Sequence, residues 1–493
     1  MTSRLDRIAQ QRLEKLERLR ARGINPYPHR YHRSHTTQQA IALLKQQEEG
    51  GGKGETPVVN IAGRIMANRR MGKISFLDIR DGSGKIQLYF HSDLVSEANL
   101  KLLKDIDIGD IIGASGKLFR TKSGEPTLEV ENFTLLSKSL RPLPEKWHGL
   151  SDIDKRHRQR YLDLIANTEV GEIFKVRSQV ITGIRQFMDK RGFLEVETPV
   201  LQPLAGGALA RPFITHHLAL NQDFYLRIAL ELYLKRLIVG GFDKVYEVGR
   251  IFRNEGISTK HNPEFTMLES YETYADYNDV MEMVEKMVSG IFRKITGGYK
   301  IRFGDNVLNF KPPWQRLSLR QTIMNYAGID FDKFPDTDSL RAEMLKLEME
   351  VDPQKDRGKL IDELISTYVE PNLIQPTFLL DYPIEISPLA KKKPDNDRLV
   401  ERFEGYAGGM EIANAFTELN DPIDQRQRFL QQQKQREAEG EAGVIDEDFV
   451  LALEYGMPPT GGLGLGIDRL VMLVTNQQSI REVILFPQLK EKA

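Results

Sequence analysis

The most restrictive feature of the sequence is a series of five short segments, before residue 140, in which apolar and polar residues alternate. Such alternation predicts half-buried β-strands. We place them at residues 58–65, 74–79, 85–90, 111–119 and 128–136. Asp81-Gly82-Ser83-Gly84 predicts a turn between the second and third strands, and residues 99–106 predict a helix between the third and fourth. This part of the chain should therefore form a small β domain with one inserted helix.

Five strands with a helix between the third and fourth are the order of an OB-fold, a partly open barrel whose face binds oligonucleotides. In the second strand Leu77 and Ile79 fall on one face and Phe76 falls on the other. In the third strand Gln87 lies opposite the apolar residues. Because the apolar faces belong in the barrel core, Phe76 and Gln87 should point outward, where an aromatic ring can stack on a base.

Composition limits the classes of partner and compartment. The 493 residues include 69 Lys and Arg against 70 Asp and Glu, so nucleic acid would have to bind a local basic surface. The sequence has no cysteine, which excludes disulfides, zinc thiolate sites and thiol nucleophiles and fits a reducing compartment. No apolar run approaches the ~18–20 residues of a membrane span, so we expect a cytoplasmic protein without a membrane partner.

The chain divides into four parts that differ in composition and in residue pattern. Residues 1–55 should form a basic helix, stopped by Gly23, and a linker that ends in a flexible glycine-rich junction at residues 50–54. The OB-fold follows at residues 56–140, and residues 141–160 form a second linker. Residues 161–493 read as an α+β region with a helical insertion at about 317–375. This region shows neither a parallel βαβ rhythm nor a P-loop, which excludes those two nucleotide-binding folds.

Two stretches of the α+β region indicate a pocket. Within residues 245–271, two strand-like runs flank a polar loop, and Phe265, Met267, Glu269 and Tyr271 share one strand face. A simple core face would not carry Glu269, because burying an unpaired carboxylate is costly. Near the C-terminus, the glycines of Gly462-x-Gly464-x-Gly466 remove side chains from one strand face, which leaves room either for a flat ligand or for close strand–helix packing.

A third stretch, residues 402–418, indicates a metal site. Gly408-Gly409 predicts a two-residue hairpin that pairs Glu404 with Ala413 and places Glu411 diagonally adjacent on the same face. Two carboxylates so close repel each other unless a cation lies between them, and such ligands with phosphates nearby suit Mg²⁺. Strict alternation puts three further residues on the opposite face, so a bulge or strong twist must intervene if all of them line one site: Asn414, Phe416 and Glu418.

Together these stretches resemble the three signature motifs of the class II aminoacyl-tRNA synthetases. The helix at residues 174–191 and the strand at 193–198 resemble the first motif, Phe252-Arg253-x-Glu255 with His261, Phe265 and Glu269 the second, and Gly462-x-Gly464-x-Gly466-x-x-Arg469 the third. An OB-fold ahead of all three is typical of the aspartyl, asparaginyl and lysyl subgroup. Within it, residues 206–213, 253–258 and 414–421 resemble the lysyl-tRNA synthetases. The resemblance implies an N-terminal OB-fold that binds the anticodon, a catalytic domain built on an antiparallel sheet with flanking helices, and a homodimer formed through the first motif.

The expected amino-acid pocket supports lysine as substrate. Glu231, Glu269 and Glu418 with Tyr271 form an acidic set suited to an ammonium group, whereas an aspartyl enzyme needs a cation there. The resemblance therefore implies a ligase that activates L-lysine with ATP and transfers it to lysine tRNA. The alternatives are an aspartyl- or asparaginyl-type synthetase, a lysine-adenylating relative that modifies a protein, and a non-catalytic RNA-binding paralogue.

The resemblance also implies a role for each site residue. Arg253 and Arg469 would be the catalytic residues that hold the phosphates and, in the case of Arg253, the lysine carboxylate. Glu404 and Glu411 would bind Mg²⁺, about three ions per active site. The remaining expected contacts with ATP are Glu255, His261, Asn262 and Phe265; those with lysine are Gly207, Glu231, Glu269, Tyr271, Asn414, Phe416 and Glu418; those with the anticodon are Arg69, Phe76 and Gln87.

Overall fold

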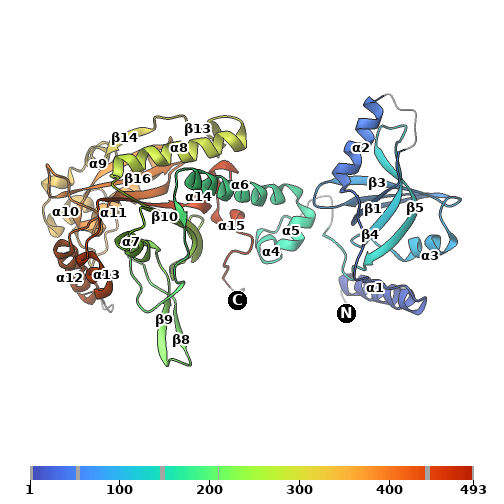
Figure 1. Cartoon of the computed structure of the whole chain (residues 1–493), viewed down its shortest axis with the longest axis horizontal. Coiled ribbons are helices and arrows are strands. Elements are labelled where there is room, and N and C mark those ends of the chain that lie inside the picture. The colour runs from blue at the N-terminus through green and yellow to red at the C-terminus, as the bar shows by residue number, and fades with distance from the viewer. Residues whose placement is uncertain (1–3, 51–55, 145–149, 209, 439–444, 491–493) are drawn as a thin grey trace. The chain divides into compact units, whose positions relative to one another are not determined.

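The computed structural model describes residues 4–50, 56–144, 150–208, 210–438 and 445–490 (Figure 1). The chain separates into two compact units, Met1–Ser151 and Asp152–Ala493. All of the expected glycine-rich junction except Gly50 lies outside the described residues. Within the described part of the chain, every helix is too short or too polar to cross a lipid bilayer.

The first unit contains a closed five-stranded barrel in the order β1-β2-β3-β5-β4. Its strands are β1 (Val59–Met71), β2 (Ile74–Arg80), β3 (Lys85–His91), β4 (Ile111–Arg120) and β5 (Pro126–Ser137). Helix α3 (Glu97–Asp105) lies between β3 and β4. The predicted order of elements is therefore confirmed, but the barrel is closed, since β1 also pairs with β4.

The faces of the barrel strands follow the predicted alternation. Leu77 and Ile79 of β2 and the apolar residues of β3 are buried in the barrel core, whereas Phe76 is half-buried on the outer face. Helices α1 (Arg4–Ala21) and α2 (Thr37–Glu49) contribute Leu19, Ala40 and Leu44 to the same core. Apolar side chains thus fill the inside of the barrel, and polar and aromatic side chains face outward.

The second unit is built on an eight-stranded sheet in the order β14-β15-β16-β17-β18-β11-β10-β6. The strands are β6 (Leu194–Glu195), β10 (Lys244–Phe252), β11 (Glu264–Thr273), β14 (Gln315–Ser318), β15 (Thr377–Pro383), β16 (Leu399–Ala407), β17 (Met410–Thr417) and β18 (Thr460–Gly466). All neighbours pair antiparallel except the outermost pairs, β14 with β15 and β10 with β6. The α+β fold class with a large antiparallel sheet is therefore confirmed.

One face of this sheet is covered by helices. Helices α6 (Thr168–Lys190), α8 (Tyr277–Thr296) and α14 (Ile467–Val474) bury their apolar sides against it, and residues of β17 and β18 such as Ala415, Leu463 and Leu465 point into that core. Alternation along the strands then turns the neighbouring residues to the other face, where the candidate site lies.

The predicted strand at residues 193–198 is wrong in length, because only Leu194–Glu195 forms a strand. Val196 still donates its main-chain N–H to Tyr246, but the N–H of Thr198 bonds the side chain of Glu247 at 3.0 Å. Because this donor is satisfied by a side chain, the regular ladder ends.

The remaining elements of this unit surround the sheet. The insertion between β14 and β15 has its own core, formed by α9 (Leu319–Ala327), α10 (Thr337–Leu345), α11 (Arg357–Leu364) and a π-helical turn (Ile365–Val369). Helices α7 (Glu231–Val239), α12 (Pro422–Ala438) and α13 (Glu447–Glu454) pack together. Figure 1 shows the β8–β9 hairpin projecting from the rest of the unit. The other bounds are α4 (Ile153–Arg158), α5 (Arg160–Ala166), β7 (Leu201–Gln202), β8 (Ile214–His217), β9 (Gln222–Leu226), β12 (Lys300–Phe303), β13 (Asn306–Asn309) and α15 (Ile480–Val483).

Candidate active site

A bulge in the β16–β17 hairpin sets the geometry of the site. The predicted register is wrong by one residue, because Glu404 pairs with Asn414 and not with Ala413. Tyr406 pairs with Glu411 and Gly405 with Ala413, so Ile412 is an extra residue on β17. Ile412 and Ala413 are both buried in the core, which returns Asn414 to the face that carries Glu411. The expected bulge is thus present, and it brings both sets of polar residues to one face.

Two adjoining cavities, of about 480 Å³ and about 340 Å³, lie on this face of the sheet. They share Arg253, Glu404 and Asn414. All the site residues predicted for this unit line one or both of them. The larger is lined by Gly207, Glu231, Glu269, Tyr271, Phe416 and Glu418, and the smaller by Glu255, His261, Asn262, Phe265, Glu411 and Arg469.

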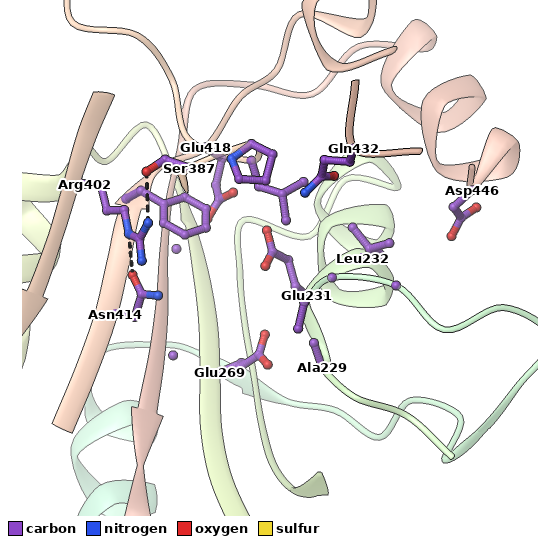
Figure 2. A pocket seen from close by; sticks show the side chains of 18 of the residues that line it. Ala229, Glu231, Leu232, Glu269, Ser387, Arg402, Asn414, Glu418, Gln432 and Asp446 are labelled. Atoms are coloured by element: carbon purple, nitrogen blue, oxygen red, sulfur yellow. Dashed lines mark hydrogen bonds between the residues drawn. The ribbon is translucent and has the colours of Figure 1, made fainter. Parts of the chain in front are cut away.

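The larger cavity is acidic. Figure 2 shows the carboxylates of Glu231, Glu269 and Glu418 turned toward one space. Burial raises the pKa of Glu269 to about 7, and the Glu231 carboxylate adds to the rise. Burial also raises the pKa of Glu418 well above its usual range, and its Oε1 atom accepts no hydrogen bond although it is buried. A cavity with these groups favours a cationic ligand.

Sequence reasoning missed Lys235, which also belongs to this acidic cluster. Its Nζ atom lies 2.5 Å from Glu231 Oε1 and forms an ion pair with Glu418 Oε2. Burial by itself would lower the pKa of Lys235, but the two carboxylates raise it above its usual value. The spacing of four residues between Glu231 and Lys235 on one helix was a usable signal.

The glycines of β18 do not leave one continuous flat surface, contrary to one of the two expectations. A Cβ atom at Gly462 would collide with Glu418 Oε1 and lie 2.7 Å from the Tyr271 ring, and one at Gly464 would lie 3.1 Å from Met267. Only Gly466 has no atom closer than 3.8 Å. Gly462 therefore makes room for the pocket carboxylate and not for a flat ligand.

Two arginines line the smaller cavity. The Arg253 guanidinium lies 5.3 Å from the centre of the Phe265 ring, and burial lowers its pKa. Arg469 donates from Nη1 to the main-chain oxygen of Glu411 at 2.5 Å and to Glu411 Oε2 at 3.1 Å. Two guanidinium groups facing one cavity favour a polyanionic ligand such as a triphosphate.

The loop between β10 and β11 places His261 and Asn262 beside these arginines. Burial lowers the pKa of His261, and the nearby Arg469 lowers it further, so the imidazole is neutral at pH 7. Asn262 donates from Nδ2 to the main-chain oxygen of Glu264 at 2.6 Å and accepts from the N–H of Gln488 at 3.3 Å. These two bonds fix the orientation of the amide and leave one N–H of Nδ2 and one lone pair of Oδ1 for a ligand.

The carboxylates of Glu404 and Glu411 suit a Mg²⁺ ion whose remaining coordination positions are filled by a bound ligand and water. Glu404 Oε2 accepts from Tyr382 at 2.8 Å and from Tyr406, and Oε1 accepts from Arg402 at 2.5 Å. A carboxylate has about four lone-pair positions, so one remains on Glu404. Burial raises the pKa of Glu404, partly offset by Arg402, and Glu411 adds to the rise, so a cation would relieve the pair.

Among the described residues, no group of three or more carboxylate or histidine side chains is arranged so that it could hold a metal ion by itself. Mg²⁺ is often held by one or two carboxylates together with substrate phosphates and water. The pair at Glu404 and Glu411 agrees with that arrangement.

Arg402 is a second residue that sequence reasoning did not assign. Figure 2 shows its guanidinium bonded to Asn414 Oδ1 (3.1 Å) and Ser387 Oγ (2.9 Å). It also donates to Glu404 Oε1, so this half-buried side chain contacts two residues, Glu404 and Asn414, that line both cavities. Because Asn414 Oδ1 accepts from Arg402, Asn414 Nδ2 is left as the donor. Arg402 lies two residues before Glu404 on β16, so the two side chains share one face, and this spacing could have identified Arg402 from the sequence.

The three residues predicted to read the anticodon lie on adjacent barrel strands. Arg69 of β1 pairs in register with Phe76 of β2, and its guanidinium lies 2.9 Å from Asp78 Oδ1. The Phe76 ring lies 5.4 Å from the Tyr89 ring, and Gln87 Oε1 accepts from Thr127 at 3.1 Å. The outer face of the barrel thus joins an aromatic pair to polar groups.

Comparisons with known proteins agree with these two units. Residues 152–490 match the family described as tRNA synthetases class II (D, K and N), and residues 59–136 match the family described as OB-fold nucleic acid binding domain. A lysine–tRNA ligase of Dehalococcoides mccartyi strain 195 is 63% identical over 487 residues, which cover 98% of this chain and 97% of the relative. The lysine–tRNA ligase of Moorella thermoacetica is 54% identical over 482 residues, with the same coverage. That of Roseiflexus sp. strain RS-1 is 53% identical over 491 residues, or 99% of both chains.

Proposed function

The chain belongs to the class II tRNA synthetases of the aspartate, lysine and asparagine group, and we propose that it is a lysine–tRNA ligase. It activates L-lysine with ATP to lysyl-adenylate and pyrophosphate and then transfers lysine to the 3′ end of lysine tRNA. Identity of 53–63% to lysine–tRNA ligases over nearly the whole chain supports this function. The OB-fold supports tRNA as the partner.

The observation that carries the choice of amino acid is the acidic cavity. Glu231, Glu269 and Glu418 are all buried there. An aspartate side chain would add a fourth carboxylate, and an asparagine amide would add no positive charge to the single ammonium of Lys235. The side-chain ammonium of lysine adds a further positive charge. Lysine therefore fits this cavity better than either competing amino acid of the group.

We propose that activation proceeds by positioning and charge neutralisation. The lysine carboxylate is ionised at pH 7, so it attacks the α-phosphorus of ATP without a general base, and the bond to pyrophosphate breaks. Arg253 lines both cavities, so it can hold the carboxylate and the α-phosphate together. Asn414 Nδ2 donates to the same carboxylate, and Arg469 binds the terminal phosphate.

For the nucleotide, we propose that Phe265 stacks on adenine while Glu255, His261 and Asn262 line its site. Glu404 and Glu411 would hold Mg²⁺, which neutralises phosphate charge when it is bound. For the substrate ammonium groups, Glu231 and the Gly207 main chain take the α-ammonium. The side-chain ammonium is bound by Glu269, Tyr271 and Glu418, with Phe416 against the aliphatic stem.

The rival functions lack a specific supporting observation. A non-catalytic RNA-binding paralogue would be expected to lose catalytic groups, yet Arg253, Glu404, Glu411 and Arg469 all line the cavities. A lysine-adenylating relative that modifies a protein would not need the barrel with its outward Phe76.

We further propose that the protein acts as a homodimer in the cytoplasm, where tRNA is charged. Strand β6 is an outer strand of the sheet, and apolar side chains are exposed on β6, on the segment that follows it and on the small sheet β7-β9-β8: Leu194, Val200, Leu201 and Ile214. Such a surface beside an open sheet edge favours a protein partner. In sedimentation, Leu201→Asp with Ile214→Asp should give monomers, whereas Tyr455→Asp, at an exposed site directly after α13, should not.

Charging of tRNA tests the proposed function. When the protein is incubated with lysine, ATP, Mg²⁺ and total tRNA, lysine should become esterified to lysine tRNA. Charging with aspartate or asparagine would replace the assignment, and tRNA binding without charging by any amino acid would favour the paralogue.

A further inference from the structure

The buried ammonium of Lys235 contacts two carboxylates that line the amino-acid cavity, and it has no place in the activation chemistry described above. It approaches Glu231 Oε1 at 2.5 Å and pairs with Glu418 Oε2. Its other neighbours include the rings of Phe416 and Phe449, whose centres lie 5.5 Å and 5.9 Å away. Lys235 is fully buried, so water does not screen these interactions.

The charges around Lys235 do not balance in the protein alone. Facing it are Glu231 from α7, Glu418 from the end of β17, and Glu269 and Tyr271 from β11. When ionised, the three carboxylates carry three negative charges against one resident ammonium. Two other carboxylates that line this cavity, those of Glu404 and Asp446, already have arginine partners, Arg402 and Arg236. The cluster therefore lacks two positive charges.

We propose that Lys235 is a specificity-determining positioning residue. It holds Glu231 and Glu418 in place and sets the charge of the cavity. The charges then balance only when the bound amino acid carries two ammonium groups. This inference rests on the proposed lysine ligase function. The α- and side-chain ammonium groups of lysine supply the two missing charges, while its carboxylate is met by Arg253. An amino acid with one ammonium group leaves a buried carboxylate unpaired.

Lys235 and the substrate do not need the same oxygen atoms. Lys235 uses Glu418 Oε2, whereas Glu418 Oε1 is buried and accepts no hydrogen bond. Lys235 uses Glu231 Oε1, which leaves Glu231 Oε2. Lys235 therefore stays in place when lysine binds, and its removal should weaken lysine binding. If Lys235 instead occupied the substrate's position, its removal would strengthen binding.

The test measures ATP–pyrophosphate exchange in the full-length protein with Lys235→Met, which keeps the side-chain length and removes the charge. The KM for lysine should rise roughly ten- to a hundred-fold, because buried carboxylates lose a charged partner and take up protons. The KM for ATP should stay within about two-fold. A lysine KM that is unchanged or lower would overturn the inference.

Lys235→Gln guards against loss of folding, since its amide can still donate to both carboxylates. The charge argument predicts a raised lysine KM for this variant too, whereas a purely hydrogen-bonding or packing role predicts a normal one. Lys138→Met is the matched control. Lys138 is also a fully buried lysine between two carboxylates, Asp107 at 2.6 Å and Asp110 at 2.8 Å, but it lies in the barrel unit. This control should lower the melting temperature and leave the lysine KM unchanged; an equal rise in lysine KM would overturn the inference.

A double variant tests the charge balance itself. Lys235→Met with Glu418→Gln removes one positive and one negative charge. The fold rise in its lysine KM should therefore be smaller than the product of the fold rises in the two single variants. A fully multiplicative loss would contradict the inference. Failure of the wild-type protein to exchange with lysine would instead contradict the proposed function, so the two failures are distinguishable.

Discussion

The Tyr271 hydroxyl donates to Glu269 Oε2 across 3.1 Å, within a part of the site that is closed to solvent. The two residues are neighbours on one face of β11, so the strand itself aligns them. The N–H of Leu230 donates to the other carboxylate oxygen at 3.0 Å. Both bonds favour the ionised carboxylate, yet burial and Glu231 outweigh them and leave the pKa of Glu269 at about 7.

The affinity for lysine should therefore depend on pH. Binding of an ammonium group requires the ionised carboxylate of Glu269, so a proton must leave when lysine binds below about pH 7. The lysine affinity should fall by up to about tenfold for each pH unit below 7 and level off above it. Calorimetry in buffers of different ionisation heat would measure the released proton. Glu269→Gln should bind lysine weakly with a smaller pH dependence; a flat profile in the wild type would contradict the assignment.

The same shift predicts the sign of a stability effect. Glu269 binds a proton more tightly in the folded protein than in the unfolded chain, where its pKa is near 4.5. Its contribution to the free energy of unfolding should then decline as the pH rises from about 4.5 to about 7, and stay constant above. Comparing urea unfolding of the wild type with Glu269→Gln across this range isolates that contribution. A contribution that grows with pH would mean that the folded-state pKa is lowered.

The metal assignment predicts that Glu411→Gln and Glu404→Gln both reduce pyrophosphate exchange by roughly ten- to a hundred-fold, the cost of losing a charged ligand. The melting temperatures should differ between them. Glu411 is partly exposed and mainly contacts Arg469, so its loss should change stability little. Glu404→Gln removes the carboxylate that forms the ion pair with the half-buried Arg402 and should melt several degrees lower. Full exchange by either variant at low Mg²⁺ would show that it is not a metal ligand.

Glu418→Gln tests the side-chain specificity. It removes a charge-assisted contact typically worth about 1.5–3 kcal/mol, so kcat/KM for lysine should fall roughly ten- to a hundred-fold. The KM for ATP should change little, because Glu418 lines only the larger of the two cavities. Equal losses for both substrates would instead indicate a collapsed site.

Phe76→Ala tests the barrel. Stacking is worth about 1–3 kcal/mol per base, so the KM for lysine tRNA should rise roughly five- to a hundred-fold. Lysine-dependent exchange without tRNA and the melting temperature should stay unchanged, because the ring is on the outer face. Tyr27→Ala, which removes an exposed aromatic ring elsewhere in the same unit, should leave the tRNA KM unaltered. A Phe76→Ala protein that melts lower with normal tRNA affinity would assign the ring to packing.

The regular parts of the fold were predictable because their signals are local. Alternation located four of the barrel strands within two residues at each end, since one face of each strand must be apolar, but β1 continues to Met71, six residues beyond its predicted end. Alternation failed at residues 193–198, where the Glu247 side chain replaces a neighbouring strand as acceptor.

The site was predictable in its composition but not in its details. Motif spacing identified residues that line the two cavities. Strict alternation placed Glu411 and Asn414 on opposite faces of the strand, which indicated that a bulge was needed if both line one site. The position of that bulge depends on how Ile412 and Ala413 pack against the helices of the opposite face. Lys235 was missed because a helical lysine is usually solvated, and Glu418, which holds it, is distant in the sequence.

The central claim is that this enzyme activates lysine, and ATP–pyrophosphate exchange with each of the twenty amino acids, without tRNA, tests it most directly. The acidic cavity predicts exchange with lysine and none of comparable rate with aspartate or asparagine. Exchange driven by aspartate or asparagine, or no exchange with any amino acid, would contradict the claim.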